Sequence, residues 1–107
     1  MILRKERLRE ILDYNPLTGL FNYKVSRGNK KAGSIAGSLH KDNGYIQIRI
    51  DGKLYYAHKL AVLYTLGKFP EDPVKHLNSI KDDNRWENLV TTVEKSKLRV
   101  KIGGVQY

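Results

Sequence analysis

An alternation of apolar and polar residues over Tyr45–Ile50 constrains the fold of this chain more than any other feature. Every second residue from position 46 to 50 is isoleucine, the pattern of a β-strand with one buried face. The Asp51-Gly52 pair that follows is a strong signal for a tight hairpin turn. We therefore expect Lys53–Tyr56 to return as an antiparallel strand. A two-residue turn would place Lys53 opposite Ile50, although the pattern alone leaves this register open.

Helix-forming patterns lie on both sides of this hairpin. Residues 2–13 place leucines one helical turn apart, as on the buried face of an amphipathic helix. The Asn15-Pro16 pair should end that helix, because the residue before a proline avoids the helical region. Residues 57–66 carry a second helical pattern, with Gly67 as its expected C-cap. Further short strands are expected at Leu20–Val25, Ser34–Leu39, Val74–Leu77 and Leu89–Thr92, and a last helix near Thr92.

These elements predict one α+β domain over residues 1–107, with antiparallel hairpins and helices. Its expected parts are an N-terminal helix (1–14), a basic strand-rich part with the second helix (16–68), a strand–loop–strand–helix unit (74–100) and a tail (101–107).

The charge of the chain favours a polyanionic partner. The sequence has 20 Lys and Arg against 11 Asp and Glu, a net charge of +9. Residues 14–68 carry nine basic and two acidic side chains, whereas residues 69–94 carry three basic and six acidic ones. An acidic island within a basic chain is typical of a metal site or a capped turn.

Several classes of protein are excluded or disfavoured by composition. The chain has no cysteine, so it forms neither disulfides nor a thiolate zinc site. No apolar run approaches the roughly 18–20 residues that span a bilayer. The first ten residues alternate in charge, unlike a signal peptide. We expect a soluble protein in the cytoplasm.

The polar stretch of residues 74–89, VKHLNSIKDDNRWENL, carries the most specific motif. It resembles the core of phage-type HNH endonucleases, in which a strand ends in Asp-His and is followed by Asn-Gly, a short loop, Asp-Asn-Arg and Asn-Leu. The matching residues are His76, Asn78, Asp83, Asn84, Arg85, Asn88 and Leu89. Residues 44–70, 16–24 and 31–39 also resemble the segments that precede this motif, so the resemblance covers most of residues 8–98.

The resemblance implies an HNH-endonuclease-like domain that ends in a ββα unit around one divalent ion. In that family the His at the first strand is the general base on a water, and a middle Asn orients it. Carried over, His76 corresponds to the base and Asn84 to the orienting residue. Asn88, with Asn78, corresponds to the frame of the loop. The alternative for His76 is a structural or solvent-facing histidine, and for Asn84 an ordinary turn residue.

Two departures from the family pattern concern the metal. The ligand that usually precedes the His is Asp, and here it is Lys75. Counting along the expected last helix, the second ligand position falls on Lys97. A lysine ammonium has three donors and no acceptor, so it cannot ligate a cation while protonated. We therefore expect no metal site and no cofactor, with Mg²⁺ or another divalent ion required only if the chain is an active nuclease.

Other basic residues are candidates for phosphate contacts. Lys75 and Lys97 would still attract a nucleic-acid backbone. The remaining candidates are Lys30, Lys31, Lys41, Arg49, Lys53, His58 and Arg85, whose alternative is a solvated basic surface. The tyrosines at 45, 55, 56 and 64 are divided between the core and stacking on bases.

Three functions remain open from the sequence. The first is a catalytically inactive nucleic-acid-binding protein, a phage or prophage product acting as a regulator or as an inhibitor of a host defence nucleoprotein complex. The second is an active metal-dependent endonuclease in which Asp82, Asp83, Glu87 or Glu94 supplies the missing ligand. The third is a protein-interaction module on the same fold. Duplex DNA is the preferred partner, and the target sequence and oligomeric state stay open.

Overall fold

The computed structural model describes residues 3–91, 100–101 and 105–106, with side chains for residues 3–91. Its elements in chain order are α1 (Lys5–Ile11), β1 (Leu12–Tyr14), β2 (Phe21–Tyr23), β3 (Ser38–Leu39), β4 (Ile46–Ile50), β5 (Lys53–Tyr56), α2 (Ala57–Leu66), β6 (Lys75–His76), the 3₁₀ turn η1 (Trp86–Asn88), β7 (Leu89–Thr91), β8 (Val100–Lys101) and β9 (Val105–Gln106). The described residues thus form a small α+β structure, as the sequence predicts.

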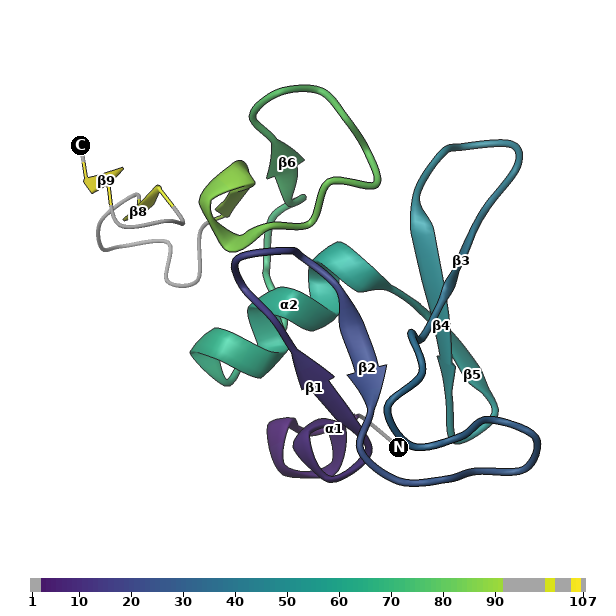
Figure 1. The fold of residues 1–107 in the computed structure, drawn as a ribbon. Helices are drawn as coiled ribbons and strands as arrows, with labels where there is room; N and C mark the ends of the chain where they lie inside the picture. Colours follow the sequence, from purple (N-terminus) through teal and green to yellow (C-terminus); the bar gives the residue numbers. More distant parts are fainter. Residues whose placement is uncertain (1–2, 92–99, 102–104, 107) are drawn as a thin grey trace.

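Helix α2 lies at the centre of the molecule, with the β1–β2 hairpin and α1 against it and the β3–β4–β5 sheet beyond (Figure 1). Its buried residues include Leu60, Ala61 and Val62, each with 0% of its surface exposed. They join Leu8 of α1, Ile48 of β4 and other apolar side chains in one core. Burial of this apolar surface is the main term that holds the small sheets to the helix.

The β4–β5 hairpin has the expected form. β4 and β5 are antiparallel, and Ile50 pairs with Lys53 across the two-residue turn. Ile48 and Ile50 are buried while Arg49 between them is exposed, as the alternation predicts. Helix α2 follows β5 directly and ends at Gly67, whose φ of 86° is the left-handed C-cap conformation.

The N-terminal helix is shorter than expected. α1 ends at Ile11, and Leu12–Tyr14 forms β1, paired with Phe21–Tyr23 of β2. The prediction of a helix over residues 1–14 is therefore wrong at its C-terminal end. Leu12 and Tyr14 are buried on either side of exposed Asp13, so strand pairing buries both apolar side chains on one face.

The C-terminal part begins with two antiparallel strands. β6 pairs with β7 so that Lys75 lies opposite Val90 and His76 opposite Leu89. The helix expected from Thr92, with Lys97 on it, falls on residues 92–99, outside the described residues. Residues 100–101 and 105–106 extend this sheet as β8 and β9, so the expected ββα unit is not confirmed. Neither described helix has the length or apolar content of a membrane span.

Candidate functional site

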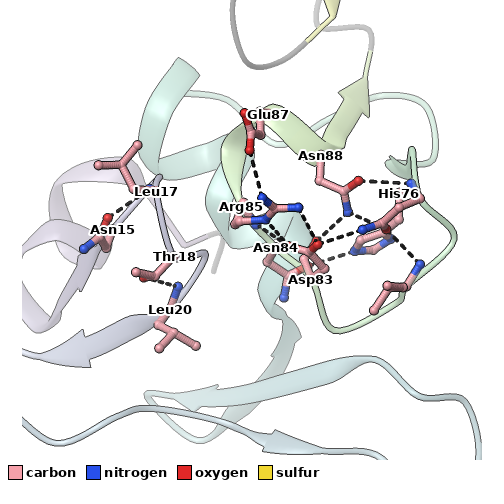
Figure 2. A network of polar contacts seen from close by, with 12 residues as sticks. Asn15, Leu17, Thr18, Leu20, His76, Asp83, Asn84, Arg85, Glu87 and Asn88 are labelled. Atoms are coloured by element: carbon pink, nitrogen blue, oxygen red, sulfur yellow. Dashed lines mark hydrogen bonds and ion pairs between the residues drawn. The ribbon is translucent and has the colours of Figure 1, made fainter.

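The loop between β6 and β7, residues 77–88, is fixed by the side chain of Asn88. Asn88 Oδ1 accepts from the backbone N–H of Asn78 at 3.0 Å, and its Nδ2 donates to the backbone oxygen of Asp83 at 2.8 Å. The same Nδ2 donates to Asn78 Oδ1 at 2.9 Å. Figure 2 shows these contacts converging beside His76. Since Asn88 is 4% exposed, its amide replaces water as the partner of loop groups that would otherwise be unpaired.

Asp83 is the second fixed point of the loop. Both oxygens of its carboxylate accept from the guanidinium of Arg85, at 2.8 and 2.9 Å, and Asn78 Nδ2 donates to it at 2.7 Å. The hydrogen bonds from Arg85 are the main reason that the pKa of Asp83 falls to about 2. Arg85 also pairs with Glu87 at 2.9 Å. The charge of Arg85 is therefore balanced within the loop.

His76 is held by Asn84. The distance from His76 Nε2 to Asn84 Oδ1 is 2.8 Å, and Asn84 is 2% exposed. Because an amide oxygen only accepts, the imidazole donates from Nε2, which leaves Nδ1 as the nitrogen that can take up a proton. The arrangement can therefore present a histidine of fixed tautomer and orientation.

The turn between β1 and β2 packs against the backbone of Asn84 and supports it. The hydroxyl of Tyr14 donates to the backbone oxygen of Asn84 at 2.5 Å, and the N–H of Trp86 donates to the backbone oxygen of Pro16 at 2.9 Å. Gly19 lies against the peptide bond of Asn84 and Arg85, where an added Cβ would come within 2.4 Å of both. Figure 2 shows this turn, from Asn15 to Leu20, beside the loop. This support was not predicted from the sequence, in which the Pro-Leu-Thr-Gly stretch at residues 16–19 is its only signal.

The residue after Asn78 has a strained backbone. Ser79 has φ of 65°, a left-handed conformation that glycine adopts at little cost. Its N–H donates to the backbone oxygen of His76 at 3.1 Å, so it closes the turn directly after the histidine. The family pattern that residues 74–89 resemble has glycine at this position.

An aromatic cluster of Tyr45, Tyr56, His58 and His76 joins the loop to the hairpin and to α2. The ring centroids of His58 and His76 are 5.1 Å apart, and those of Tyr45 and His58 are 4.8 Å apart. His58 is only 4% exposed, so its ring lies inside this cluster rather than on the surface where a phosphate contact was expected. Burial, followed by the neighbouring charges of His76 and Lys59, lowers the pKa of His58 to about 4.

Two lysines lie over rings of the aromatic cluster, and a third precedes His76 in β6. Lys75 precedes His76 and is exposed. The ammonium of Lys59 is 5.8 Å from the centroid of the Tyr56 ring, and that of Lys81 is 5.3 Å from the Tyr45 ring. Lys59 and Lys81 were not among the candidates from the sequence. The start of α2 places Lys59 over Tyr56, and the fold of the loop places Lys81 over Tyr45; the motif over residues 74–89 specifies neither.

The other predicted binding residues divide between two ends of the β4–β5 hairpin. Lys41 lies before Tyr45, at the end near His76, whereas Lys53 lies at the opposite end. The exposed Lys30 and Lys31 belong to the loop that Arg27 joins to Asp51 at that far end. Arg49 donates to the backbone oxygen of Gly52 there. The structure thus places Lys41 in the turn before Tyr45, whose ring packs on His76, and leaves Lys30, Lys31, Arg49 and Lys53 at the opposite end of the hairpin.

The described residues do not offer a ligand set for a divalent ion. Residues 3–91 hold no group of three or more His, Asp or Glu side chains that could bind a metal. Asp83 and Glu87, two of the four residues that could supply the missing metal ligand, are paired with Arg85. Asp82 is exposed, and Glu94 and Lys97 lie outside the described residues.

A family model matches part of the chain. Residues 55–95 match the family model of HNH endonuclease, a segment that begins within β5 and includes α2, β6, the 77–88 loop and β7. This match confirms the resemblance to an HNH-type family and indicates a nuclease-family function related to nucleic acids. No curated protein and no solved structure matches the chain significantly.

Proposed function

We propose that this chain binds nucleic acid through the HNH-type framework around His76 and does not cleave it. The observation that carries the proposal is the hydrogen-bonded pair of His76 and Asn84, with Lys75 directly before the histidine. His76 is held by Asn84 at 2.8 Å, while exposed Lys75 occupies the position of the family's carboxylate ligand. A protonated lysine offers no lone pair and repels a cation. The same ammonium attracts a phosphate.

The proposed binding surface is the end of the molecule that carries His76. Lys75, Lys59 and Lys81 are exposed there around the aromatic cluster, and Lys41 lies in the adjoining turn. Contacts of this kind are made mainly to the backbone and carry little sequence information. The proposed partner is therefore duplex DNA or a nucleoprotein complex, recognised chiefly through charge.

A binding experiment tests this surface with two variants of equal charge change. Lys75→Ala/Lys81→Ala removes two charges at the His76 end, and Lys30→Ala/Lys53→Ala removes two at the far end. Each lost phosphate contact lowers affinity, so we expect roughly tenfold weaker binding of a labelled 20-base-pair duplex by the first variant and less than about threefold by the second. Absence of duplex binding by the unmodified protein at low salt would overturn the proposal.

A plasmid assay tests the absence of cleavage. Supercoiled plasmid is incubated with the protein and Mg²⁺, Mn²⁺, Ni²⁺ or Zn²⁺ in turn. We expect no nicking with any of the four ions. Nicking that disappears in His76→Ala would show an active nuclease instead.

That active nuclease is the second candidate function. It is favoured by the retained hydrogen bond between His76 and Asn84, which would hold a general base in a defined orientation. In that case a bound Mg²⁺ or similar ion would supply Lewis-acid polarisation of the phosphate. At least one ligand must then come from Asp82, from Glu94 or from a rearranged Asp83.

The proposed biological role is regulation rather than degradation of nucleic acid. A binding protein of this family, of phage or prophage origin in the cytoplasm of a bacterium, would act as a repressor or as an inhibitor of a host defence complex. The third possibility, a protein-interaction module, would use the acidic segment 71–94 as its docking face. The net charge of +9 favours the nucleic-acid partner.

A further inference from the structure

An open pocket of about 340 Å³ lies beside the aromatic cluster, between the start of α2 and the connector that precedes β6. It is lined by Tyr45, Tyr56, His58 and Lys59 and by residues 70–74. Its volume is within the range of pockets that bind small organic ligands. The binding surface proposed above shares Lys59 and the aromatic cluster with this pocket, but assigns no ligand to the pocket itself.

The walls of the pocket suit a flat ring. The rings of Tyr56 and His58 are nearly parallel, at 23°, with centroids 5.4 Å apart. Asn43 Nδ2 donates to the hydroxyl of Tyr56 at 3.1 Å, which fixes that ring. Pro70 and Pro73 supply rigid apolar surface from the connector. Aromatic side chains of this kind stack on nucleobases.

The polar groups of the pocket restrict what the ring carries. Glu71 and Asp72 line it with exposed carboxylates, and neither makes an ion pair with a described residue. Carboxylates accept hydrogen bonds and repel phosphate, so a ligand must present donors to them, such as the N–H groups of a base. His58 Nδ1 is buried without a hydrogen-bond partner among the described residues. Lys59 lines the same pocket, and its exposed ammonium can take an adjoining phosphate.

We propose that this pocket holds one unpaired nucleobase with an exocyclic amino group, stacked on Tyr56 and donating to Glu71 and Asp72. The inference rests on the proposed function, because the base would belong to a bound nucleic acid. His58 contacts His76, so the base would lie next to the histidine of the HNH-type loop. Carboxylates recognise the amino group of cytosine in this way.

The test compares two strands whose bases differ at the edge proposed to meet the carboxylates: cytosine has an amino group at C4 and an acceptor at N3, and uracil has an oxygen at C4 and an N–H at N3. Fluorescence anisotropy measures binding of labelled dC12 and dU12, which carry equal charge; cytosine presents an amino group where uracil presents a carbonyl oxygen. We expect roughly fivefold tighter binding of dC12. Glu71→Ala/Asp72→Ala should reduce that ratio to within about twofold. The control Glu6→Ala/Asp42→Ala has the same charge change outside the pocket and should keep the ratio. Tyr56→Leu should weaken both strands about equally.

The outcomes separate this inference from the proposed function. Equal binding of dC12 and dU12 by a protein that still binds duplex would overturn the nucleobase assignment of the pocket and leave the proposed function standing. Loss of the ratio in the control variant would overturn it as well. No binding of any strand or duplex would remove the proposed function, and the pocket assignment with it. If free dCMP competes and dUMP does not, the pocket recognises the nucleotide itself; a retained ratio without such competition assigns recognition to a base within a strand.

Discussion

Ser79 is the single residue at which the loop beside His76 is held against its own backbone preference. Its φ of 65° lies in the left-handed region, which non-glycine residues adopt at a cost of about 1 kcal/mol or more. The side chain of Asn88 makes three hydrogen bonds within the loop, one accepted and two donated, and Asn78 donates to Asp83. These bonds fix the loop on both sides of Ser79. The strain is therefore tolerated because its surroundings determine the conformation.

Replacing Ser79 by glycine should stabilise the protein. We expect Ser79→Gly to raise the free energy of unfolding by about 0.5–1 kcal/mol, since glycine adopts this φ without strain. Urea denaturation measures the change. The control is Ser38→Gly in β3, at an exposed position without positive φ, which should be neutral or destabilising. A loss of stability in Ser79→Gly would contradict the strained turn.

His58 should make stability depend on pH. Its pKa is about 4 in the folded protein and near 6.5 when unfolded, so the unfolded chain takes up the proton first as pH falls. The stability associated with this group is complete above pH 6.5 and is lost as pH falls toward 4. From pH 7 to 4.5 the loss is about 2–3 kcal/mol. Urea denaturation at both values should show a smaller loss in His58→Phe, and an equal loss in both proteins would refute the assignment.

At the scale of elements, the β1–β2 turn is a support for the site rather than a separate hairpin. Gly19 brings this turn into contact with the backbone of Asn84, the residue that holds His76. Tyr14 bonds the same backbone from the preceding strand. The position of His76 therefore depends on residues more than fifty positions before it.

Gly19→Ala should displace this support. Its Cβ would meet backbone atoms at 2.4 Å, so we expect a loss of about 2–4 kcal/mol in the free energy of unfolding. Gly52→Ala is the matched control, with a similar φ of 84° and nothing within 4 Å of the new Cβ. It should cost only the backbone strain, about 1 kcal/mol. Equal losses in the two variants, measured in urea, would show that the contact at Gly19 is unimportant.

The elements that the sequence predicts correctly are those with one consistent local signal. The Asp51-Gly52 turn and Gly67 mark the ends of β4, β5 and α2, and the structure has them at those residues. Leu12 satisfies both a helical and an alternating pattern, and only the pairing with β2 decides between them. The aromatic cluster was not predicted as a unit, because its four residues come from three separate segments.

At the scale of the whole molecule, the charged residues near His76 include paired acids at positions 83 and 87 and exposed lysines. The described loop beside His76 holds three of the six acids of residues 69–94, and two of them, Asp83 and Glu87, are paired with Arg85. The lysines around it remain exposed. The motif over residues 74–89 predicts which residues form the loop. It does not predict that Lys59 and Lys81 lie over the tyrosine rings, because that depends on how the chain folds.

Affinity for duplex DNA should fall steeply with salt. If four or five lysines each neutralise a phosphate, the released counterions make affinity fall roughly 10²–10³-fold between 50 and 200 mM salt. Anisotropy of a labelled duplex over that range measures the slope. A slope near zero would show that binding does not depend on phosphate contacts.

The central proposal is that Lys75 and Lys97 stand where the HNH-type pattern has metal ligands, and calorimetric titration with Mn²⁺ tests it most directly. The unmodified protein is compared with Lys75→Asp/Lys97→Asn, which supplies a carboxylate and an amide oxygen and removes two repelling cations. We predict no saturable binding by the unmodified protein and binding at millimolar Mn²⁺ or better by the variant. Micromolar binding by the unmodified protein that is lost in His76→Ala would contradict the claim, as would a folded double variant that binds no ion.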